Sequence, residues 1–245
     1  EGEFVDDKRQ GKGKIKDKNG DILYEGDFLD NKRHGKGIER TREGEVYEGQ
    51  WANDMRNGEG RCKYPNGDEY FGNWKDNMKS GRGVYQYRDD SRYEGEWLED
   101  KQHGKGIEVW KDGSRFEGDF ERGVKKGKGV FRWKSGAVYE GEFLNNEISG
   151  YGYHVWPSGK KYKGYWRNNM MHGKGELDYG DKRKYVGEFS DDKKHGYGEF
   201  EWEDGKKYKG QWEKGKRHGI GVFIDENGKE KKGQWRQGKL LRWLE

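Results

Sequence analysis

The sequence is poor in the aliphatic residues that usually fill a protein core. Leu, Ile, Val and Phe together account for only 35 of its 245 residues, whereas charged residues make up 40%. Such a composition is typical of disordered chains, but those are also poor in aromatic residues. This chain has 11 Trp, 16 Tyr and 10 Phe. We therefore expect a folded protein whose core is built from rings.

Other absences narrow the class of protein further. The single cysteine, Cys62, excludes an internal disulfide bond and favours a reducing, cytoplasmic setting. No apolar run approaches the roughly 18 residues of a transmembrane helix. No signal peptide is visible, but the chain begins at Glu1 and not at Met, so we leave open that it belongs to a longer protein. The net charge of +4 is small beside 51 basic and 47 acidic residues, and it does not indicate nucleic-acid binding.

Glycine, in contrast, is abundant and recurs at a fixed period. A glycine of the Tyr-x-Gly type returns every 23 residues, at Gly26, Gly49, Gly72, Gly95, Gly118, Gly141, Gly164, Gly187, Gly210 and Gly233. Gly2 is one more copy, and a Gly-x-Gly pair repeats in step from Gly11/Gly13 to Gly219/Gly221. The pattern predicts one continuous array of about ten repeats over residues 1–238, with a C-terminal cap or tail over residues 239–245.

Each repeat alternates with the period of a β-strand. Tyr47, Gly49 and Trp51 share one face, and the segment from Gly58 to Tyr64 alternates in the same way. The third residue after the aromatic is always Gly, Asn or Asp, which predicts a left-handed turn conformation. The fold class is therefore all-β: an elongated, solenoid-like single antiparallel sheet of tandem 23-residue β-hairpins. At ~4.8 Å per strand, twenty strands would span about 95 Å.

The glycines are expected to make room for the rings. In the stretch "YEGEWLEDKQHGKG", alternation places Tyr93 and Trp97 on the same face as Gly104 and Gly106. Flat rings that lie across bare glycine backbone would form a thin core without a second sheet.

The combination of Tyr-x-Gly-x-Trp and His-Gly-x-Gly resembles the MORN (membrane occupation and recognition nexus) repeat. The copies "YEGDFLDNKRHGKG", "YEGEWLEDKQHGKG", "YKGYWRNNMMHGKG" and "YKGQWEKGKRHGIG" carry the resemblance, which covers nearly the whole chain. It implies a twisted antiparallel sheet with a groove and scaffolding or targeting roles in cytoskeletal, ciliary and membrane-contact assemblies. It also implies that some members bind lipid, that some dimerise, and that enzymes with such repeats keep catalysis in a separate domain.

We find no catalytic, cofactor-binding or metal-binding residues, and we expect that the chain is not an enzyme. The Gly-x-Gly pairs lack the following helix of a phosphate-binding loop. Five histidines occupy the His-Gly position: His34, His103, His172, His195 and His218. Neighbours such as His195 and His218 would lie about 9–10 Å apart, too far to converge on one zinc ion. Cys62 falls at a core position.

Two features exceed the repeat pattern. Apolar residues occupy outward positions at Tyr151, Tyr153, Val155 and Tyr165, which predicts a protein-binding surface. A second outward group, Ile220, Val222 and Ile224, precedes the C-terminal segment "KLLRWLE". That segment is expected to cover this group or to mediate a homodimer.

The second feature is a charge asymmetry. The net charges of the ten turn segments that follow the aromatic residues sum to +10. The rest of the chain therefore carries a net charge of −6. The structural interpretation is a solvated rim that keeps sheets from pairing edge to edge. The functional one is a basic edge that binds anionic phospholipids through Lys32, Arg33, Lys125, Lys126, Lys216 and Arg217. Our first hypothesis is a non-catalytic scaffold for cytoskeletal or ciliary proteins. The alternatives are a peripheral membrane module and the targeting region of a larger enzyme.

Overall fold

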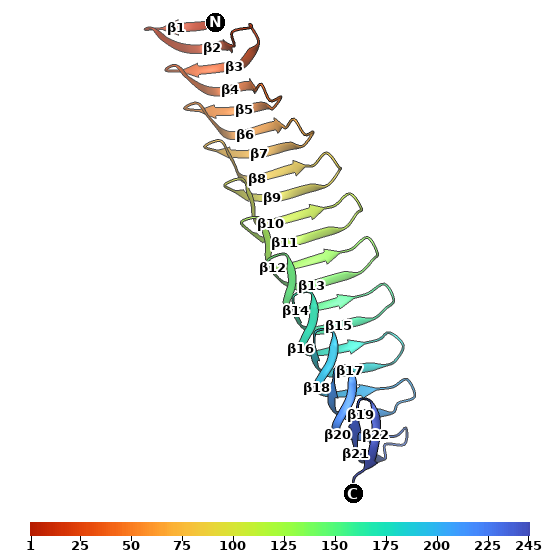
Figure 1. Ribbon diagram of the computed structural model, residues 1–245. Helices are drawn as coiled ribbons and strands as arrows, with labels where there is room; N and C mark the ends of the chain where they lie inside the picture. Colours follow the sequence, from red (N-terminus) through yellow and green to blue (C-terminus); the bar gives the residue numbers. More distant parts are fainter. The chain divides into compact units, whose positions relative to one another are not determined.

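The computed structural model describes all residues from 1 to 245 as strands and short turns, with no helix. It contains two compact units, residues 1–124 and residues 125–245. In each unit the strands lie side by side in sequence order as a single layer (Figure 1). The all-β class and the tandem antiparallel hairpins are thus confirmed. The prediction of one continuous array over residues 1–238 stays a prediction.

Unit 1 consists of hairpins with short turns at both ends. Its strands are β1 (Gly2–Val5), β2 (Lys8–Lys16), β3 (Ile22–Leu29), β4 (Lys32–Arg40), β5 (Val46–Ala52), β6 (Met55–Lys63), β7 (Glu69–Lys75), β8 (Met78–Gln86), β9 (Arg92–Leu98), β10 (Lys101–Val109) and β11 (Arg115–Glu121).

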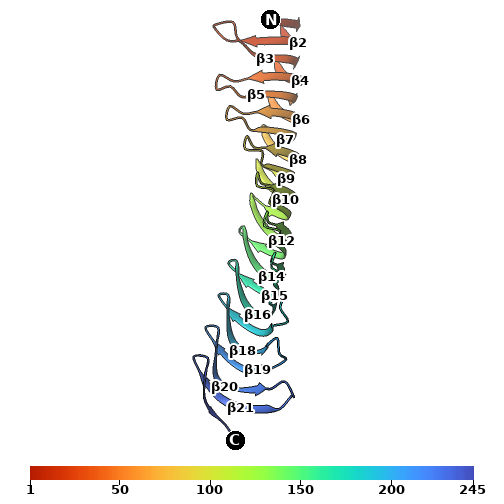
Figure 2. The ribbon, with the colours of Figure 1, turned by 90° about the vertical axis from the view of Figure 1, so that its right-hand side faces the viewer.

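Unit 2 repeats the arrangement, and its strands are visibly curved (Figure 2). They are β12 (Val124–Arg132), β13 (Val138–Leu144), β14 (Glu147–Val155), β15 (Lys161–Arg167), β16 (Met170–Asp178), β17 (Lys184–Ser190), β18 (Lys193–Glu201), β19 (Lys207–Glu213), β20 (Lys216–Ile224), β21 (Glu230–Arg236) and β22 (Lys239–Trp243). The C-terminal segment therefore forms a strand, β22, that pairs with β21.

The rings and the glycines form the core on one side of the sheet, which we call the aromatic face. Tyr24, Tyr47 and their counterparts are almost fully buried, as are the Trp and Phe residues four positions later. A Cβ atom added to Gly37 would lie 2.3 Å from the Tyr24 Oη, because the ring lies directly on this glycine. The predicted glycine floor is confirmed.

The tyrosine hydroxyls are satisfied within the same repeat. Tyr24 Oη donates to the Asp27 carbonyl oxygen at 3.1 Å. The tryptophan indole instead bonds to the preceding repeat, since Trp51 Nε1 donates to the Gly37 carbonyl oxygen at 3.3 Å. Burial raises the pKa of Tyr24 to about 12, so the phenol stays neutral. Each tyrosine also meets the large ring of the next repeat edge to face, as Tyr24 does with Trp51 at 5.4 Å between centroids.

The Gly-x-Gly pair contains two glycines with different roles. Gly106 lies opposite Gly95 and under Tyr93, but the pairing of β9 with β10 shifts between His103 and Gly106. Gly104 has φ +58°, and its added Cβ would meet the Glu96 carboxylate and no ring. The prediction that Gly104 shares the ring face is therefore wrong. A β-bulge interrupts the alternation on which that prediction depended.

The hairpin turns confirm the predicted left-handed position. Asn31, Asp54 and Asn169 have φ between 64° and 70°, and the residue before each is also left-handed, as in type I′ turns. The side chains do more than allow this conformation. Asp54 Oδ1 accepts a hydrogen bond from the Arg33 N–H at 2.8 Å, and Asn169 Oδ1 accepts one from Ile148 N–H at 2.8 Å. Each turn thus fastens itself to the bulged strand of the preceding repeat.

Candidate protein-binding surfaces

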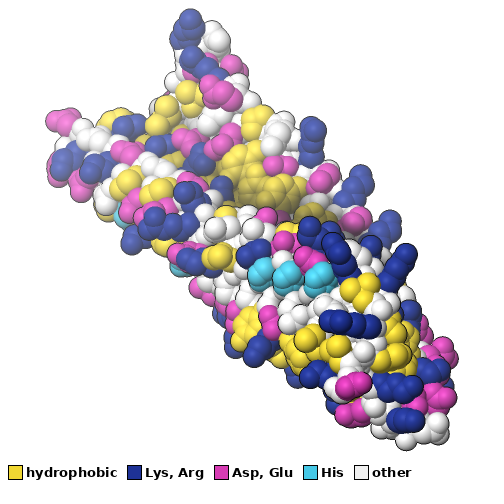
Figure 3. Space-filling model, turned by 60° about the horizontal axis from the view of Figure 1, so that its bottom comes forward, with side chains coloured by type: hydrophobic (Ala, Val, Ile, Leu, Met, Phe, Trp, Pro, Cys, Tyr) yellow, Lys and Arg dark blue, Asp and Glu magenta, His cyan; other side chains and the backbone are white.

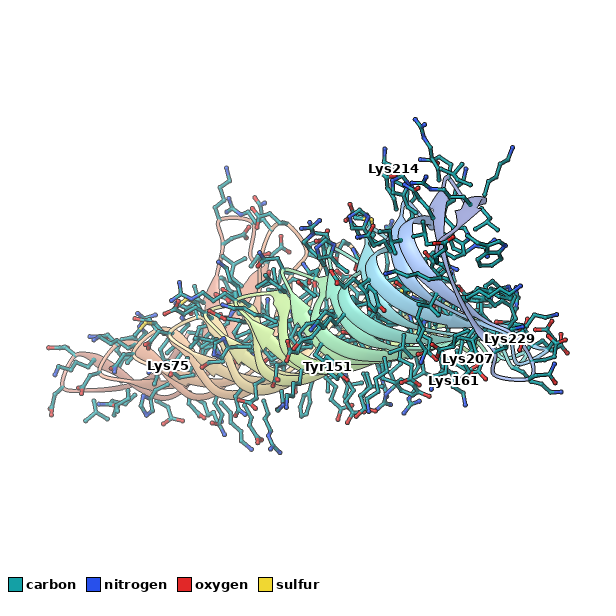
Figure 4. The ribbon with its side chains drawn as sticks, turned by 90° about the horizontal axis from the view of Figure 1, so that it is seen from below. Lys75, Tyr151, Lys161, Lys207, Lys214 and Lys229 are labelled. Atoms are coloured by element: carbon teal, nitrogen blue, oxygen red, sulfur yellow. The ribbon has the colours of Figure 1, made fainter.

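The sheet face opposite the aromatic face, which we call the outer face, carries the predicted apolar patch. Tyr151 and Tyr165 are direct partners on β14 and β15, and their ring centroids lie 5.3 Å apart. Tyr151, Tyr153 and Tyr165 are 43%, 39% and 53% exposed. Figure 4 shows Tyr151 extending away from the sheet. We call Tyr151, Tyr153, Val155 and Tyr165 the Tyr patch.

The neighbours of the Tyr patch are charged. Tyr153 lies opposite Glu140 on β13 and Lys163 on β15, and Val155 lies opposite Val138 and Lys161. The structure therefore brings the four predicted residues together on two adjacent strands, bordered by polar side chains. This arrangement of an apolar centre within a polar rim is common in protein interfaces.

Sequence reasoning missed other exposed apolar residues of the outer face. Val186 on β17 and Tyr197 on β18 are 47% and 61% exposed. Val186 lies three strands from Tyr153, and Tyr197 lies three strands from Tyr165, each in the same row of cross-strand neighbours. In unit 1, Phe71 on β7 is also exposed. The outward parity of these residues was a sufficient signal, because each stands directly beside a residue of the aromatic face: Tyr70, Tyr185 or Gly198.

Unit 1 has a cavity of about 1080 Å³ on its outer face. Glycine backbone forms part of its lining, and Ile38, Phe71 and Val84 contribute apolar side chains. The charged lining residues are largely paired with each other, as Lys14 is with Glu25 at 2.8 Å and Arg61 is with Glu69. The cavity is therefore lined by both apolar and paired charged residues, and neither sign of charge predominates in it.

The six basic residues of the predicted edge lie in different environments. Lys32, Lys126 and Lys216 are exposed, whereas Arg33, Lys125 and Arg217 are half-buried. Arg33 lies on the aromatic face, 4.1 Å from the Trp51 ring centroid, and it pairs with Glu39 at 2.5 Å and with Asp54 at 3.3 Å. Arg217 lies 5.6 Å from the Trp202 ring and donates to the Gly238 carbonyl oxygen at 3.2 Å. Arg33 lies opposite Phe28 and Arg217 lies opposite Trp212 on the neighbouring strand, so both share the face of the rings.

A different edge of unit 2 also carries lysines. Lys161, Lys207 and Lys229 gather at one side of the unit, while Lys214 stands at the opposite turn (Figure 4). Many of these cations have partners: Lys207 Nζ lies 3.2 Å from Glu201 Oε2. Figure 3 shows the same mixture across the visible surface, where both charge signs alternate with hydrophobic side chains.

The titratable groups give no sign of a reaction centre. No three His, Cys, Asp or Glu side chains are arranged to hold a metal ion. Cys62 is fully buried, and burial raises the pKa of its thiol to about 11, which leaves it unreactive. His195 is exposed and the other four repeat histidines are half-buried. The fold also contains no helix of the length and hydropathy needed to cross a membrane.

These features define a class: single-layer β-hairpin repeat proteins whose aromatic residues lie on a glycine floor. The MORN repeat family model matches residues 1–22, 24–46, 47–69, 70–92, 93–115, 116–138, 139–161, 162–182, 185–207 and 208–230. The chain therefore belongs to the MORN repeat family. No match is found among curated proteins.

Solved structures with a similar strand arrangement are distant. The TCP10 domain of Danio rerio CPAP is 12% identical, with a TM-score of 0.45 over 84% of this chain and 98% of that one. The Drosophila melanogaster SAS-4 (dCPAP) TCP domain, solved with a proline-rich motif of Ana2, is 14% identical, with a TM-score of 0.38 over 71% and 86%. The CPAP G-box domain is 11% identical, with a TM-score of 0.43 over 82% and 99%. At these values the similarity carries no statement about function.

Proposed function

We propose that this chain is a non-catalytic scaffold that binds another protein through the Tyr patch. The observation that carries the proposal is the pair Tyr151 and Tyr165, two exposed rings in mutual contact on a sheet face where most other repeats place polar or charged residues. Their burial in the aromatic core is impossible, because they lie on the opposite side from Trp166 and Tyr162.

Physical chemistry favours a protein ligand for this patch. Tyrosine contributes a large contact area at a low cost in side-chain entropy, and it is enriched among the residues that dominate binding energy. The backbone beneath is a regular sheet, so the rings are held in place before a partner arrives. Such preorganisation improves affinity because less freedom is lost on binding.

Family membership supports a setting for the proposed scaffold. Membership in the MORN family supports a cytoskeletal or ciliary assembly in the cytoplasm as the place of action, and catalysis is assigned to other proteins or domains. A homodimer contact at the C-terminal end would use Leu241 and Trp243, which are exposed on β22.

The membrane alternative has less support from the side-chain positions. Arg33 and Arg217 are held against rings and bonded to other groups, which leaves mainly Lys32 and Lys216 of their pairs to meet a lipid surface. Binding to anionic lipid would be strongly salt-dependent, whereas a Tyr-centred interface would not depend mainly on salt.

Site-specific photo-crosslinking tests the proposal. A photoreactive phenylalanine at Tyr165 is expected to capture a specific partner in cells, and the same group at Phe71, which is equally exposed in unit 1, serves as the control. The purified partner should then bind the chain, and the triple change of Tyr151, Tyr153 and Tyr165 to Ser should weaken binding at both low and high salt.

The opposite pattern would reject the proposal. Unimpaired partner binding by the triple Ser variant would exclude the Tyr patch. Loss of binding to phosphatidylserine vesicles after charge reversal at Lys32, Lys126 and Lys216, with no partner captured from Tyr165, would instead support the membrane module.

A further inference from the structure

Two cations of unit 2 lie among rings on the aromatic face without a carboxylate partner. Lys194 Nζ lies 4.2 Å from the Phe200 ring centroid and 4.4 Å from that of Trp212. Arg217 Cζ lies 5.6 Å from Trp202 and 5.7 Å from Tyr208. The ion pairs of the surrounding strands involve other side chains, such as Lys207 with Glu201. The rings attract the two cations weakly, but no anion neutralises them.

The corresponding cations of unit 1 do have carboxylate partners. Lys79 occupies the position of Lys194 five repeats earlier, and its Nζ lies 3.5 Å from Asp100 Oδ1 at the hairpin turn. Arg33 pairs with Asp54 at the equivalent turn. In unit 2 these turn positions are Gly215 and Gly238, next to Lys194 and Arg217.

Burial disfavours the charged form of both cations, and positive neighbours also disfavour that of Lys194. Burial, together with the charges of Arg183 and Arg217, lowers the pKa of Lys194 to about 8. Burial lowers the pKa of Arg217 as well. An anion that binds between the two cations would favour the charged form of Lys194. The attraction between the anion and both cations would then contribute to its binding free energy.

We propose that Lys194 and Arg217 form a carboxylate-binding site on the aromatic face of unit 2, which takes an acidic peptide segment of a partner protein. The chain supplies the template itself, since Asp100 and Asp54 show that a carboxylate fits this position beside the rings. Both cations are half-buried, so a side chain reaches them more readily than a flat membrane surface does. The site rests on the proposed protein-binding function but lies on the face opposite to the Tyr patch.

The spacing of the cations restricts the peptide. Lys194 is on β18 and Arg217 is on β20, so with β19 between them they lie about 9–10 Å apart along the sheet. In the polyproline II conformation residues i and i+3 point to the same side and lie about 9.3 Å apart. Two acidic residues separated by two prolines therefore match the two cations.

Binding of a synthetic peptide tests the site on the whole chain. The probe is an acetylated proline peptide with two glutamates three residues apart, and its control carries glutamine at both places. The glutamate peptide is expected to bind and to raise the pKa of Lys194 above about 8, followed by NMR of ¹³C-labelled lysine. Lys194→Gln and Arg217→Gln should each weaken binding by about tenfold, the usual effect of losing a charged hydrogen bond. Lys79→Gln, the matched control, should leave the affinity unchanged.

A gain-of-pairing variant makes the test sharper. Gly215→Asp should recreate the pair of Lys79 with Asp100, because Asp adopts the same left-handed turn at Asp100 and Asp192. The variant should raise the pKa of Lys194 without peptide and weaken peptide binding by about tenfold.

Several results would overturn the proposal. They are no binding of the glutamate peptide at low salt, equal binding of the glutamine peptide, and unchanged binding by the Lys194→Gln/Arg217→Gln double variant. Loss of phosphatidylserine vesicle binding in that double variant, without peptide binding, would assign the cations to lipid instead. None of these results depends on the Tyr patch, so the scaffold proposal would still stand or fall by the crosslinking experiment.

Discussion

Replacing Gly106 by Val should destabilise the hairpin of β9 and β10, because the new side chain would enter the space of a buried ring. A Cβ atom at Gly106 would lie 2.4 Å from Tyr93 Oη and 2.6 Å from both Cζ and Cε2 of the ring. Real Cβ atoms do not approach other heavy atoms so closely. The φ of Gly106 is not left-handed, so backbone strain contributes little and the effect isolates the ring contact.

The size of the effect depends on whether Tyr93 can move away. Tyr93 is fully buried, its hydroxyl donates to the Glu96 carbonyl oxygen at 3.0 Å, and its ring meets Trp97 edge to face at 5.2 Å. Displacement would break the hydrogen bond, worth about 1 kcal/mol, and disturb the ring packing. We therefore expect a loss of about 1–3 kcal/mol, the usual range for an overfilled core.

Hydrogen exchange is the appropriate assay, since repeat proteins open locally and a single unfolding transition would average over the chain. The amides of β9 and β10 should lose protection in Gly106→Val. In Lys105→Val they should change by less than about 0.5 kcal/mol, because Lys105 is exposed on the outer face. Equal losses in the two variants would refute the assignment of faces.

Three further predictions concern single positions. Asn169→Gly should lower the free energy of unfolding by about 1 kcal/mol, because it keeps the left-handed turn but removes the acceptor for the Ile148 N–H. Asn169→Ala should lower it by about 1–2 kcal/mol more, because Ala is strained at this positive φ. Equal thermal shifts of the two variants would contradict this. His154 is stacked between Trp133 and Trp156 at 5.1 and 4.1 Å, and burial lowers its pKa to about 4. An unfolded histidine titrates near 6.5, so the unfolded state binds more protons between pH 6.5 and 4, and stability should fall as the pH is lowered through this window. His154→Phe, which places the residue of Phe131 and Phe200 at this position, should flatten the dependence of the urea midpoint on pH, and an unchanged slope would reject the explanation. Cys62 should react with a thiol reagent only after unfolding in urea, and rapid labelling of the native protein would show that it is not buried.

The repeating part of the fold was predictable because it depends on local choices. Alternation identified the strands, Gly, Asn or Asp at the turn predicted its left-handed conformation, and the pairing of Tyr93 with Gly106 predicted the glycine floor. The Tyr patch followed from the same parity, since its tyrosines alternate with Gly152 and Gly164 of the ring face.

The bulge was not predictable from alternation, and the error at Gly104 traces to it. Counting positions through Gly104 placed this glycine on the ring face. The net charge of the turn segments, taken without regard to which face each residue occupies, placed Arg33 and Arg217 on a solvated edge. Because these arginines lie opposite the ring-face residues Phe28 and Trp212, their side chains reach Trp51 and Trp202. The absence of a partner for Lys194 depends on contacts between repeats, which no single repeat reveals.

The contact between successive repeats has a direction, and this bears on how the chain folds during synthesis. Tyr24 is covered by Trp51 of the following repeat, and the bulged strand at Arg33 is fastened by Asp54, which also comes later in the chain. A repeat that has just left the ribosome therefore lacks both its ring cover and its turn bond until about 20 more residues have emerged. Folding from the N-terminus should accordingly lag one repeat behind synthesis, with a single unfinished tyrosine exposed at the growing end.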